Sequence, residues 1–326
     1  FFIMIEKKFL ASLNIEKEDV GSRLDRILLK KFNSLSFMKV QKLIRVGFFK
    51  VNNKKVKANY KINVYDKIEY SNKLINENEN KFIKDISSIL IKYKKQIADI
   101  KKNIIFEDNF LLVINKPYGI PVQGGNKVNF NIDLILPLLT KDNSPLRLVH
   151  RIDKNTSGIL LLAKSKEVAQ NITMLFKENK IKKKYLTVVE GKLTKKIGKI
   201  TLPVIKKKIS GIEKMVVDPY SKEKAETSYK VIDYKKGLSL LEVYPKTGRK
   251  HQIRAHLQSI NHPILGDNKY NKTNGDNKGV SSKKMHLHAK EIQFVLNNNK
   301  YSFKASLPNF FKETIKKINI ENMTYE

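Results

Sequence analysis

The chain has 326 residues and a formal net charge of +34 at pH 7, from 65 Lys and Arg against 31 Asp and Glu. A chain of this length predicts a core domain of about two hundred residues or more together with a smaller module. The absence of cysteine excludes disulfides, thiolate metal sites and thiol nucleophiles. The positive charge suits a polyanionic partner, nucleic acid first, although part of the lysine excess also fits the codon bias of an A/T-rich genome.

The first residues, FFIMIEKKFLASL, do not have the pattern of a signal peptide, because the apolar run is short, charges come early and no small-residue cleavage site follows. No later stretch approaches about eighteen uninterrupted apolar residues, the length that a membrane-spanning helix needs. We therefore expect a cytoplasmic protein that does not contact a membrane.

Residues 14–70 predict a compact unit of two helices followed by short strands. Apolar residues recur at helical spacing in LDRILLKKF (24–32) and VQKLI (40–44), and the short runs that follow are separated by Asn-Asn and Tyr-Asp turns. Basic residues lie largely on the outer face of the helices, where they either line an RNA backbone or form a solvated surface. The candidates for RNA contacts are Arg23, Arg26, Lys39, Lys42 and Arg45.

Residues 71–102 are polar and charged with weak periodicity, which predicts a linker that contains a short helix between 83 and 100. A second domain follows at 103–326. Its expected strands are 110–114, 159–163, 201–205, 239–244, 284–295 and 301–305, and its expected helices are 166–177, one that begins near 255 and one after 308.

A dense polar island lies between two apolar runs in LVHRIDKNTSGILLLAK (148–164). Asp153 is its centre, and Arg151 and Lys154 beside it favour an ionised carboxylate that can act as a nucleophile or base. The second apolar run has the length and composition of a buried strand. The alternative interpretation is an aspartate that caps a turn and pairs with the neighbouring cations.

The string H-R-I-D-K-N-T-S-G, followed by an apolar strand and Ala-Lys, resembles the catalytic-aspartate motif of the RluA/RluC/RluD family of RNA pseudouridine synthases. Three further segments resemble family motifs in the family's order: NKPYG (115–119), KKYLTVVEG (183–191) and GRKHQIR (248–254), where Lys250 replaces the usual Thr or Ser. The segments GSRLD and VQKLIRVG are similar to the alpha-L RNA-binding domain, which also occurs in the fourth protein of the small ribosomal subunit. Asn53 departs from the glycine that is usual there.

The resemblance implies an α+β fold. A helix-plus-strand alpha-L domain (14–70) and a linker (71–102) would precede a catalytic domain (103–326) built on a mixed, mainly antiparallel β-sheet with flanking helices. The implied reaction is site-specific isomerisation of uridine to pseudouridine in RNA. The implied substrate is large-subunit (23S) ribosomal RNA, because the sequence is most similar to the RluC-type enzymes. The family needs no cofactor and no metal, and we expect a monomer without an obligate protein partner.

The resemblance also gives roles to single residues. Asp153 would be the nucleophile or base, Arg254 its ion-pair partner, and Tyr185 the phenol that packs against the uracil. Arg151 would fill the space that the flipped base leaves, and Leu287 would line the uracil pocket. The other residues expected to bind substrate are His150, Thr156 and Arg249.

The sequence also bears on a metal site and on two rival functions. The spacings of His251, His256 and His262 match no zinc pattern, so we expect no metal site. Lys116, before Pro-Tyr-Gly, is expected to shape the wall of the cleft. One rival function is a non-catalytic RNA-binding protein of ribosome assembly that retains the fold. The other is a nucleic-acid hydrolase, which would need a second carboxylate beside Asp153 or metal ligands.

Overall fold

The computed structural model of the chain describes residues 11–32, 35, 37–70, 91–124, 129–140, 146–209, 211–271 and 282–320. They belong to two compact units, and the boundary between the units lies between Lys94 and Lys95. Helix α4 (Lys94–Lys102) buries Ile97 and Ile100. Residues 95–102, which the sequence predicts to be part of the linker, therefore belong to the second unit. None of the described helices is both long enough and apolar enough to cross a bilayer.

The first unit contains β1 (Ala11–Leu13), a 3-10 helix (Lys17–Asp19), α1 (Leu24–Lys31), α2 (Phe37–Arg45), β2 (Lys50–Val51) and β3 (Ile68–Tyr70). Its strands pair antiparallel in the order β1-β3-β2. The two predicted helices are confirmed, and strand β1 precedes them. Their spacing of three and four residues turns one face of each helix into the core, which takes Leu24, Ile27, Leu28, Val40, Leu43 and Ile44 from them.

The second unit is built on one large sheet. Its strands are β4 (Ile104–Glu107), β5 (Leu111–Lys116), β6 (Arg147–Leu148), β7 (Ser157–Ala163), β8 (Lys182–Glu190), β9 (Ile197–Ile200), β12 (Thr227–Lys235), β13 (Leu238–Pro245), β14 (Leu287–Leu296) and β15 (Asn299–Lys304). The order is β4-β5-β7-β14-β8-β13-β12-β9, with β15 paired to β14 and β6 to β7. Of these described pairs only β7 with β14 is parallel, which confirms the mixed, mainly antiparallel sheet.

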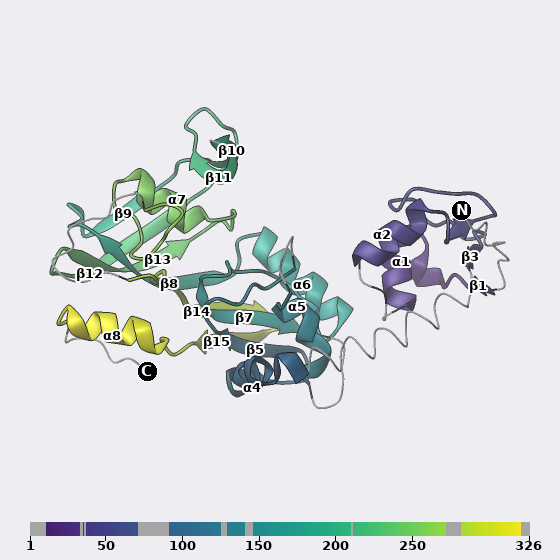
Figure 1. Cartoon of the computed structure of the whole chain (residues 1–326), viewed down its shortest axis with the longest axis horizontal. Helices are drawn as coiled ribbons and strands as arrows, with labels where there is room; N and C mark the ends of the chain where they lie inside the picture. Colours follow the sequence, from purple (N-terminus) through teal and green to yellow (C-terminus); the bar gives the residue numbers. More distant parts are fainter. Residues whose placement is uncertain are drawn as a thin grey trace. The chain divides into compact units, whose positions relative to one another are not determined.

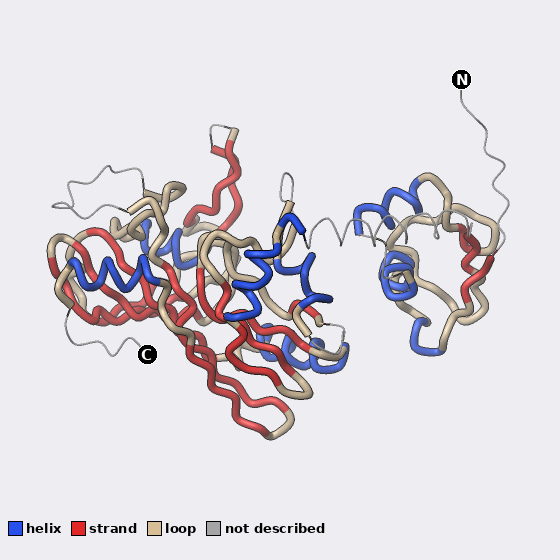
Figure 2. The backbone as a smooth tube through the Cα atoms, turned by 60° about the horizontal axis from the view of Figure 1, so that its bottom comes forward, coloured by secondary structure: helices blue, strands red, loops and turns tan. Residues whose placement is uncertain are grey.

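Helices cover the faces of this sheet, as Figures 1 and 2 show. Helix α6 (Lys166–Lys177) has the predicted bounds and packs Val168 and Ile172 against β7. Helix α7 (Gln252–Ser259) packs on the face of β8 and β13 that carries Val189 and Leu241, and α8 (Asn309–Lys317) packs on the opposite face. A short α5 (Ile132–Ile135) precedes a 3-10 turn (Leu136–Leu138), and the hairpin of β10 (Val204–Ile209) and β11 (Ile212–Val217) projects from the sheet in Figure 1.

Several element boundaries differ from the sequence prediction, among them the following three. Strand β5 continues through Lys116, which we had placed in a turn. The expected strand 201–205 was wrong in its first part, because β9 ends at Ile200 and the next strand starts at Val204, after a proline without a backbone donor. Helix α7 begins at Gln252 rather than near 255.

One glycine allows the central pairing of the sheet. Gly158, in β7, pairs with Ala289 of β14 and has a φ of 107°. A Cβ atom at this position would lie 2.3 Å from the carbonyl oxygen of Ala289, so only glycine fits. The close approach brings the first residue of β14, Leu287, next to the loop that carries Asp153.

Candidate active site

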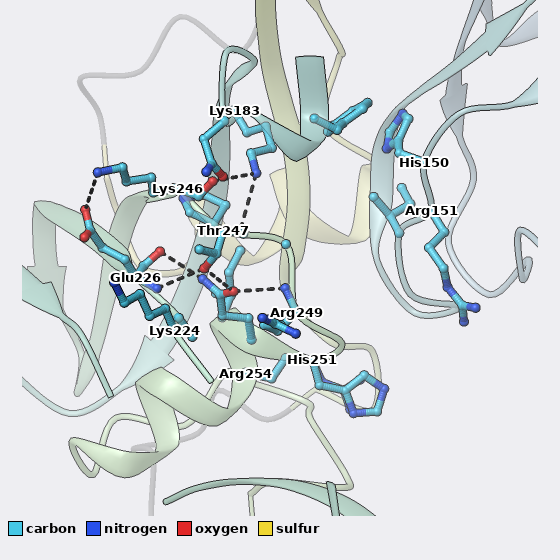
Figure 3. Close-up of a pocket in the computed structure, with 18 of the residues that line it drawn as sticks. His150, Arg151, Lys183, Lys224, Glu226, Lys246, Thr247, Arg249, His251 and Arg254 are labelled. Carbon is cyan, nitrogen blue, oxygen red and sulfur yellow. Dashed lines mark hydrogen bonds and ion pairs between the residues drawn. The ribbon is translucent and has the colours of Figure 1, made fainter. Parts of the chain in front are cut away.

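A cleft of about 1340 Å³ opens on the second unit, and Asp153, Tyr185, Arg254 and Leu287 all line it. They come from four separate segments: the loop before β7, strand β8, helix α7 and the start of β14. Figure 3 shows part of this lining, with Arg254 and His251 close together. The residues that the sequence grouped by resemblance therefore meet in one place.

The backbone of the Asp153 loop is held at several points. The N–H of Thr156 donates to the carbonyl of Asp153 (3.1 Å), which closes a tight turn. The carbonyl of Lys154 accepts from the N–H of Gly119 (3.0 Å), and Nε2 of His150 accepts from the N–H of Leu161 in β7 (2.8 Å). The carboxylate of Asp153 thus stands on a loop with little freedom, and its side chain is 20% exposed in the cleft.

Lys116 lies directly beneath this loop and is completely buried. Its ammonium donates to the carbonyls of Pro117 (2.9 Å), Ile120 (2.7 Å) and Lys154 (3.3 Å). Burial lowers the pKa of Lys116 to about 7, and the nearby Asp153 carboxylate acts in the opposite direction. Lys116, which we expected to shape the wall of the cleft, therefore links the NKPYG segment (115–119) to the Asp153 loop.

Lys116→Met is expected to destabilise the second unit by about 2–4 kcal/mol, because it leaves buried carbonyls without a donor. The difference in unfolding free energy between Lys116→Met and the native protein should also depend on pH. The unfolded chain holds a proton on this lysine up to about pH 10.5, whereas the folded protein holds it only below about 7. Stability contributed by Lys116 therefore rises with pH in that window, by at most about 1.4 kcal/mol per pH unit.

Urea unfolding of both proteins at pH 7, 8 and 9 measures this difference. Lys102→Met, at an exposed position of α4, is the matched control and should change little. A stability difference between Lys116→Met and the native protein that stays constant with pH would contradict the assigned state of the amine.

Arg254 joins two carboxylates. Its Nη1 donates to Oδ2 of Asp153 (2.9 Å), while Nε and Nη2 hold Asp267 in a bidentate pair (2.7 and 2.8 Å). Its guanidinium also lies over the ring of Tyr270, 4.8 Å from the centroid. Burial acts against the charge, but Asp267 and then Asp153 outweigh it and raise the pKa of Arg254. The arginine therefore remains a fixed cation beside Asp153.

The start of α7 explains why Arg254 points inward. His251, the residue before the helix, adopts the left-handed conformation (φ 54°), and its Nδ1 lies 2.9 Å from the hydroxyl of Tyr270. Buried Gln252 accepts from the N–H of Arg249 (3.0 Å) and donates to the carbonyl of Glu226 (2.9 Å). These contacts fix the helix start, so that its third residue, Arg254, faces the cleft.

His251 also lies beside the ion pair of Asp153 and Arg254. Its Nε2 lies 3.7 Å from Oδ2 of Asp153. Burial lowers the pKa of His251 to about 4, although the Asp153 carboxylate opposes the shift. The imidazole is therefore neutral at pH 7, and Arg254 is the charge that balances Asp153. The other two histidines of the segment hold backbone carbonyls, His256 that of Leu202 and His262 that of Glu190.

Tyr185 and Leu287 form an apolar wall of the cleft and belong to one cluster with α7. Burial raises the pKa of Tyr185, and the Asp153 carboxylate adds to the rise, so the phenol keeps its proton at neutral pH. Leu287 is 4% exposed. Flat aromatic and aliphatic surface beside a carboxylate suits a planar base.

The remaining predicted residues line the same cleft in different ways. Arg151 is exposed and reaches Oε1 of Gln123 (3.5 Å). Thr156 is buried in the turn, and Arg249 forms an exposed ion pair with Glu223. The ring of His150 stacks on Phe176, and its Nε2 accepts from the backbone, so His150 also holds the loop in place.

In the first unit, the predicted RNA-binding arginines fall into two groups. Arg26 and Arg45 are exposed. Arg23 forms a bidentate pair with buried Asp25 (2.7 and 3.1 Å), so it also stabilises the fold. The side chains of Lys39 and Lys42, on α2, lie outside the described residues.

Comparison with known proteins agrees with this geometry. The sequence model of the family described as RNA pseudouridylate synthase matches residues 110–259, and that of the S4 domain matches residues 22–68. A protein named ribosomal large subunit pseudouridine synthase C from Buchnera aphidicola subsp. Baizongia pistaciae is 34% identical over 94% of this chain and 96% of its own length. A protein of the same name from Pasteurella multocida is 32% identical over 86% of this chain and 85% of its own.

The solved structure of human RNA pseudouridylate synthase domain containing 4 superposes with a TM-score of 0.60 at 29% identity, covering 70% of this chain and 97% of that one. Human RNA pseudouridylate synthase domain containing 1, at 22% identity and a TM-score of 0.54 over 63% of this chain and 83% of that one, shares the fold. Matched along most of its length, this chain belongs to the RNA pseudouridine synthase family and carries an S4 domain in its first unit.

Proposed function

We propose that the substrate is large-subunit ribosomal RNA and that Asp153 starts the isomerisation. The proposed substrate is inferred from the relatives, which are named as large-subunit enzymes and match most of the chain. The role of Asp153 rests on one observation: its carboxylate is exposed to the cleft while bound to a buried guanidinium, beside Tyr185 and Leu287.

The reaction rearranges one nucleotide without a second reactant. The N1–C1′ bond of uridine breaks, the uracil turns, C5 bonds to C1′, the C5 proton leaves and N1 gains a proton. Asp153 can begin by attacking C1′, by adding to C6 or by removing the C2′ proton, and each route needs an ionised carboxylate. Arg254 donates a charge-assisted hydrogen bond to this carboxylate and fixes its orientation in the cleft.

The target base must first leave its stack, which costs a few kcal/mol. The wall of Tyr185 and Leu287 receives the uracil, and the Tyr185 phenol, still protonated, offers a hydrogen bond rather than a charge. Arg151, adjacent to Asp153 and exposed, is our candidate for the residue that fills the vacated space.

The second carboxylate at the site does not support a hydrolase. Oδ2 of Asp267 is bound by Nε of Arg254, and Oδ1 by Nη2 of Arg254 and by the N–H groups of Lys269 and Tyr270. Asp267 is also 2% exposed, so it cannot activate a water molecule for attack. The complete set of Asp153, Tyr185 and Arg254 likewise speaks against a non-catalytic assembly protein.

We also propose that the enzyme acts as a monomer in the cytoplasm, without an obligate protein partner or cofactor. Every group named above comes from one unit of one chain. These side chains supply the nucleophile or base, its ion-pair partner and the surface on which the uracil packs.

The first unit is proposed to bring the RNA to the enzyme through its exposed basic face. Arg26→Gln combined with Arg45→Gln should weaken RNA binding several-fold and lower the slope of log affinity against log salt by about 1 to 2, because two phosphate contacts are lost. The turnover number at saturating RNA should stay unchanged.

Arg23→Gln differs from this double variant, because the loss of the ion pair with Asp25 should lower the melting temperature of the first unit. Filter binding between about 50 and 200 mM salt measures the slopes. An unchanged slope in the double variant would exclude this face as the RNA contact.

Mapping pseudouridines in ribosomal RNA from a strain that lacks this gene tests the substrate. Carbodiimide treatment followed by primer extension should show the loss of one or a few pseudouridines from large-subunit RNA. Purified protein should restore them on an unmodified transcript. A complete large-subunit map in the deletion strain would contradict the proposal, and parallel maps of small-subunit and transfer RNA would then reveal another substrate.

A further inference from the structure

Lys183 is a half-buried cation in the cleft that the steps above do not use. It lies in β8, two residues before Tyr185, and the period of two along a strand puts both side chains on the face that lines the cleft. Its ammonium donates to the carbonyls of Lys246 and Thr247, each at 3.3 Å, as Figure 3 shows. An ammonium has three donors, so these contacts leave one for a ligand.

No carboxylate of the described residues forms an ion pair with Lys183, whereas its neighbour Lys184 pairs with Glu242 and Glu291. Burial lowers the pKa of Lys183 to about 8, and no carboxylate counteracts this. Half-buried cations of this kind are stabilised when an anion arrives, because the new partner offsets the desolvation of the charge. An anionic ligand would therefore give Lys183 the counter-charge that the described residues do not supply.

A second, smaller cleft meets the first at this lysine. It has a volume of about 460 Å³, and Lys183 and Lys246 line both cavities. The smaller cleft is also lined by Ile181, Lys182, Lys184, Tyr244, Pro245 and Gln293, with Glu291 as the acidic member. The smaller cleft, which has four lysines, one glutamate and the ring of Tyr244, therefore adjoins the larger cleft at Lys183.

We propose that Lys183 binds a backbone phosphate of the RNA next to the target uridine, and that this strand leaves the active site along the smaller cleft. The proposal rests on the proposed function and adds a binding residue to it. Two residues along β8 separate Lys183 from Tyr185 by about 7 Å, the scale of one nucleotide. A uracil on the tyrosine wall therefore brings an adjacent phosphate within reach of the ammonium.

Lys183→Met tests the proposal, since methionine retains the length of the side chain and removes its charge. With an unmodified large-subunit RNA transcript as the probe, KM should rise about 10-fold while kcat changes by less than about 3-fold, as expected for a contact made equally in ground and transition states. The slope of log KM against log salt should fall by about 0.7, the value for one phosphate on a single strand. Lys300→Met, exposed on β15 and lining neither cavity, should match the native enzyme.

Phosphate ethylation interference identifies the contact. RNA ethylated at random on its phosphates is selected by binding to each protein, and ethyl groups that block binding are mapped. At one phosphate beside the target uridine, ethylation should block the native protein and have no effect on Lys183→Met. Identical interference patterns, an unchanged salt slope, or a loss of kcat alone would overturn the proposal.

Two further measurements distinguish an unfolded variant from the loss of a phosphate contact. A thermal melt of Lys183→Met within a few degrees of the native one shows that the fold is retained, and Lys183→Arg, which keeps the charge, should restore most of the affinity. If the native enzyme forms no pseudouridine in the transcript, the proposed substrate fails. The interference comparison still tests Lys183, because it measures binding.

Discussion

Asp153→Asn is expected to abolish isomerisation, by about 10³-fold or more, while the fold and RNA affinity stay nearly intact. The amide has the shape of the carboxylate but cannot act as a nucleophile or base. Stability should change by only about 1 kcal/mol, because Asp153 is partly exposed and Arg254 retains its bidentate partner Asp267.

Release of tritium from RNA labelled at C5 of uridine measures turnover, and filter binding measures affinity. The matched control is Asp99→Asn, at an exposed position of α4, which should be fully active. Asp153→Asn with near-native turnover would remove Asp153 from the chemistry. A variant that is inactive because it no longer binds RNA would give it a binding role instead.

Arg254→Leu is expected to lower both stability and activity. It leaves Asp267, with a side chain only 1% exposed, without its main counter-charge, at a cost of about 3–5 kcal/mol. Activity should fall as strongly as in Asp153→Asn, because the carboxylate loses the hydrogen-bonded ion-pair partner that orients it. Arg254→Lys should recover little, since an ammonium cannot form the bidentate pair.

Double-mutant cycles separate the two partners of Arg254. With Asp267→Leu added, the uncompensated charge is gone, and most of the lost unfolding free energy should return while activity stays low. Combined with Asp153→Asn, Arg254→Leu should show a smaller coupling in urea unfolding, because Asp153 is the more exposed partner. Strictly additive effects of Arg254→Leu and Asp153→Asn would mean that the Asp153–Arg254 pair contributes nothing to the free energy of unfolding.

The sequence predicted the parts of the site that lie on regular or motif-like segments. Strand β7 and helix α6 follow from an apolar run and a helical period, and the polar residues between core segments marked Asp153. The pairing of Arg254 with Asp153 was expected from the resemblance, and the structure places the two side chains at 2.9 Å. Asn53, in place of the usual glycine, adopts the left-handed conformation (φ 62°) that its side chain tolerates.

The partners that position these residues could not be predicted, because they come from distant turns. Asp267 is an ordinary turn residue in the sequence, and only its place beside α7 makes it the main counter-charge of Arg254. Lys116 reaches the carbonyl of a residue 38 positions away, and nothing in a Lys-Pro pair indicates burial. The apolar run predicted a strand that ends at Ile114, and only the structure shows that the strand continues through Lys116 and buries its side chain, where a charged group needs several acceptors.

The parallel pairing at Gly158 also has a consequence for the order in which we expect the chain to fold during its synthesis. Strand β7 is made early in the second unit, but its parallel neighbour β14 follows about 130 residues later, as the separation of 131 positions between Ser157 and His288 shows. Such distant pairs form late, because a long loop must close first. The strands of the first unit pair within residues 11–70, so we expect this unit to fold before the second one is complete. The part of the chain proposed to bind RNA would then be folded before the active site is assembled.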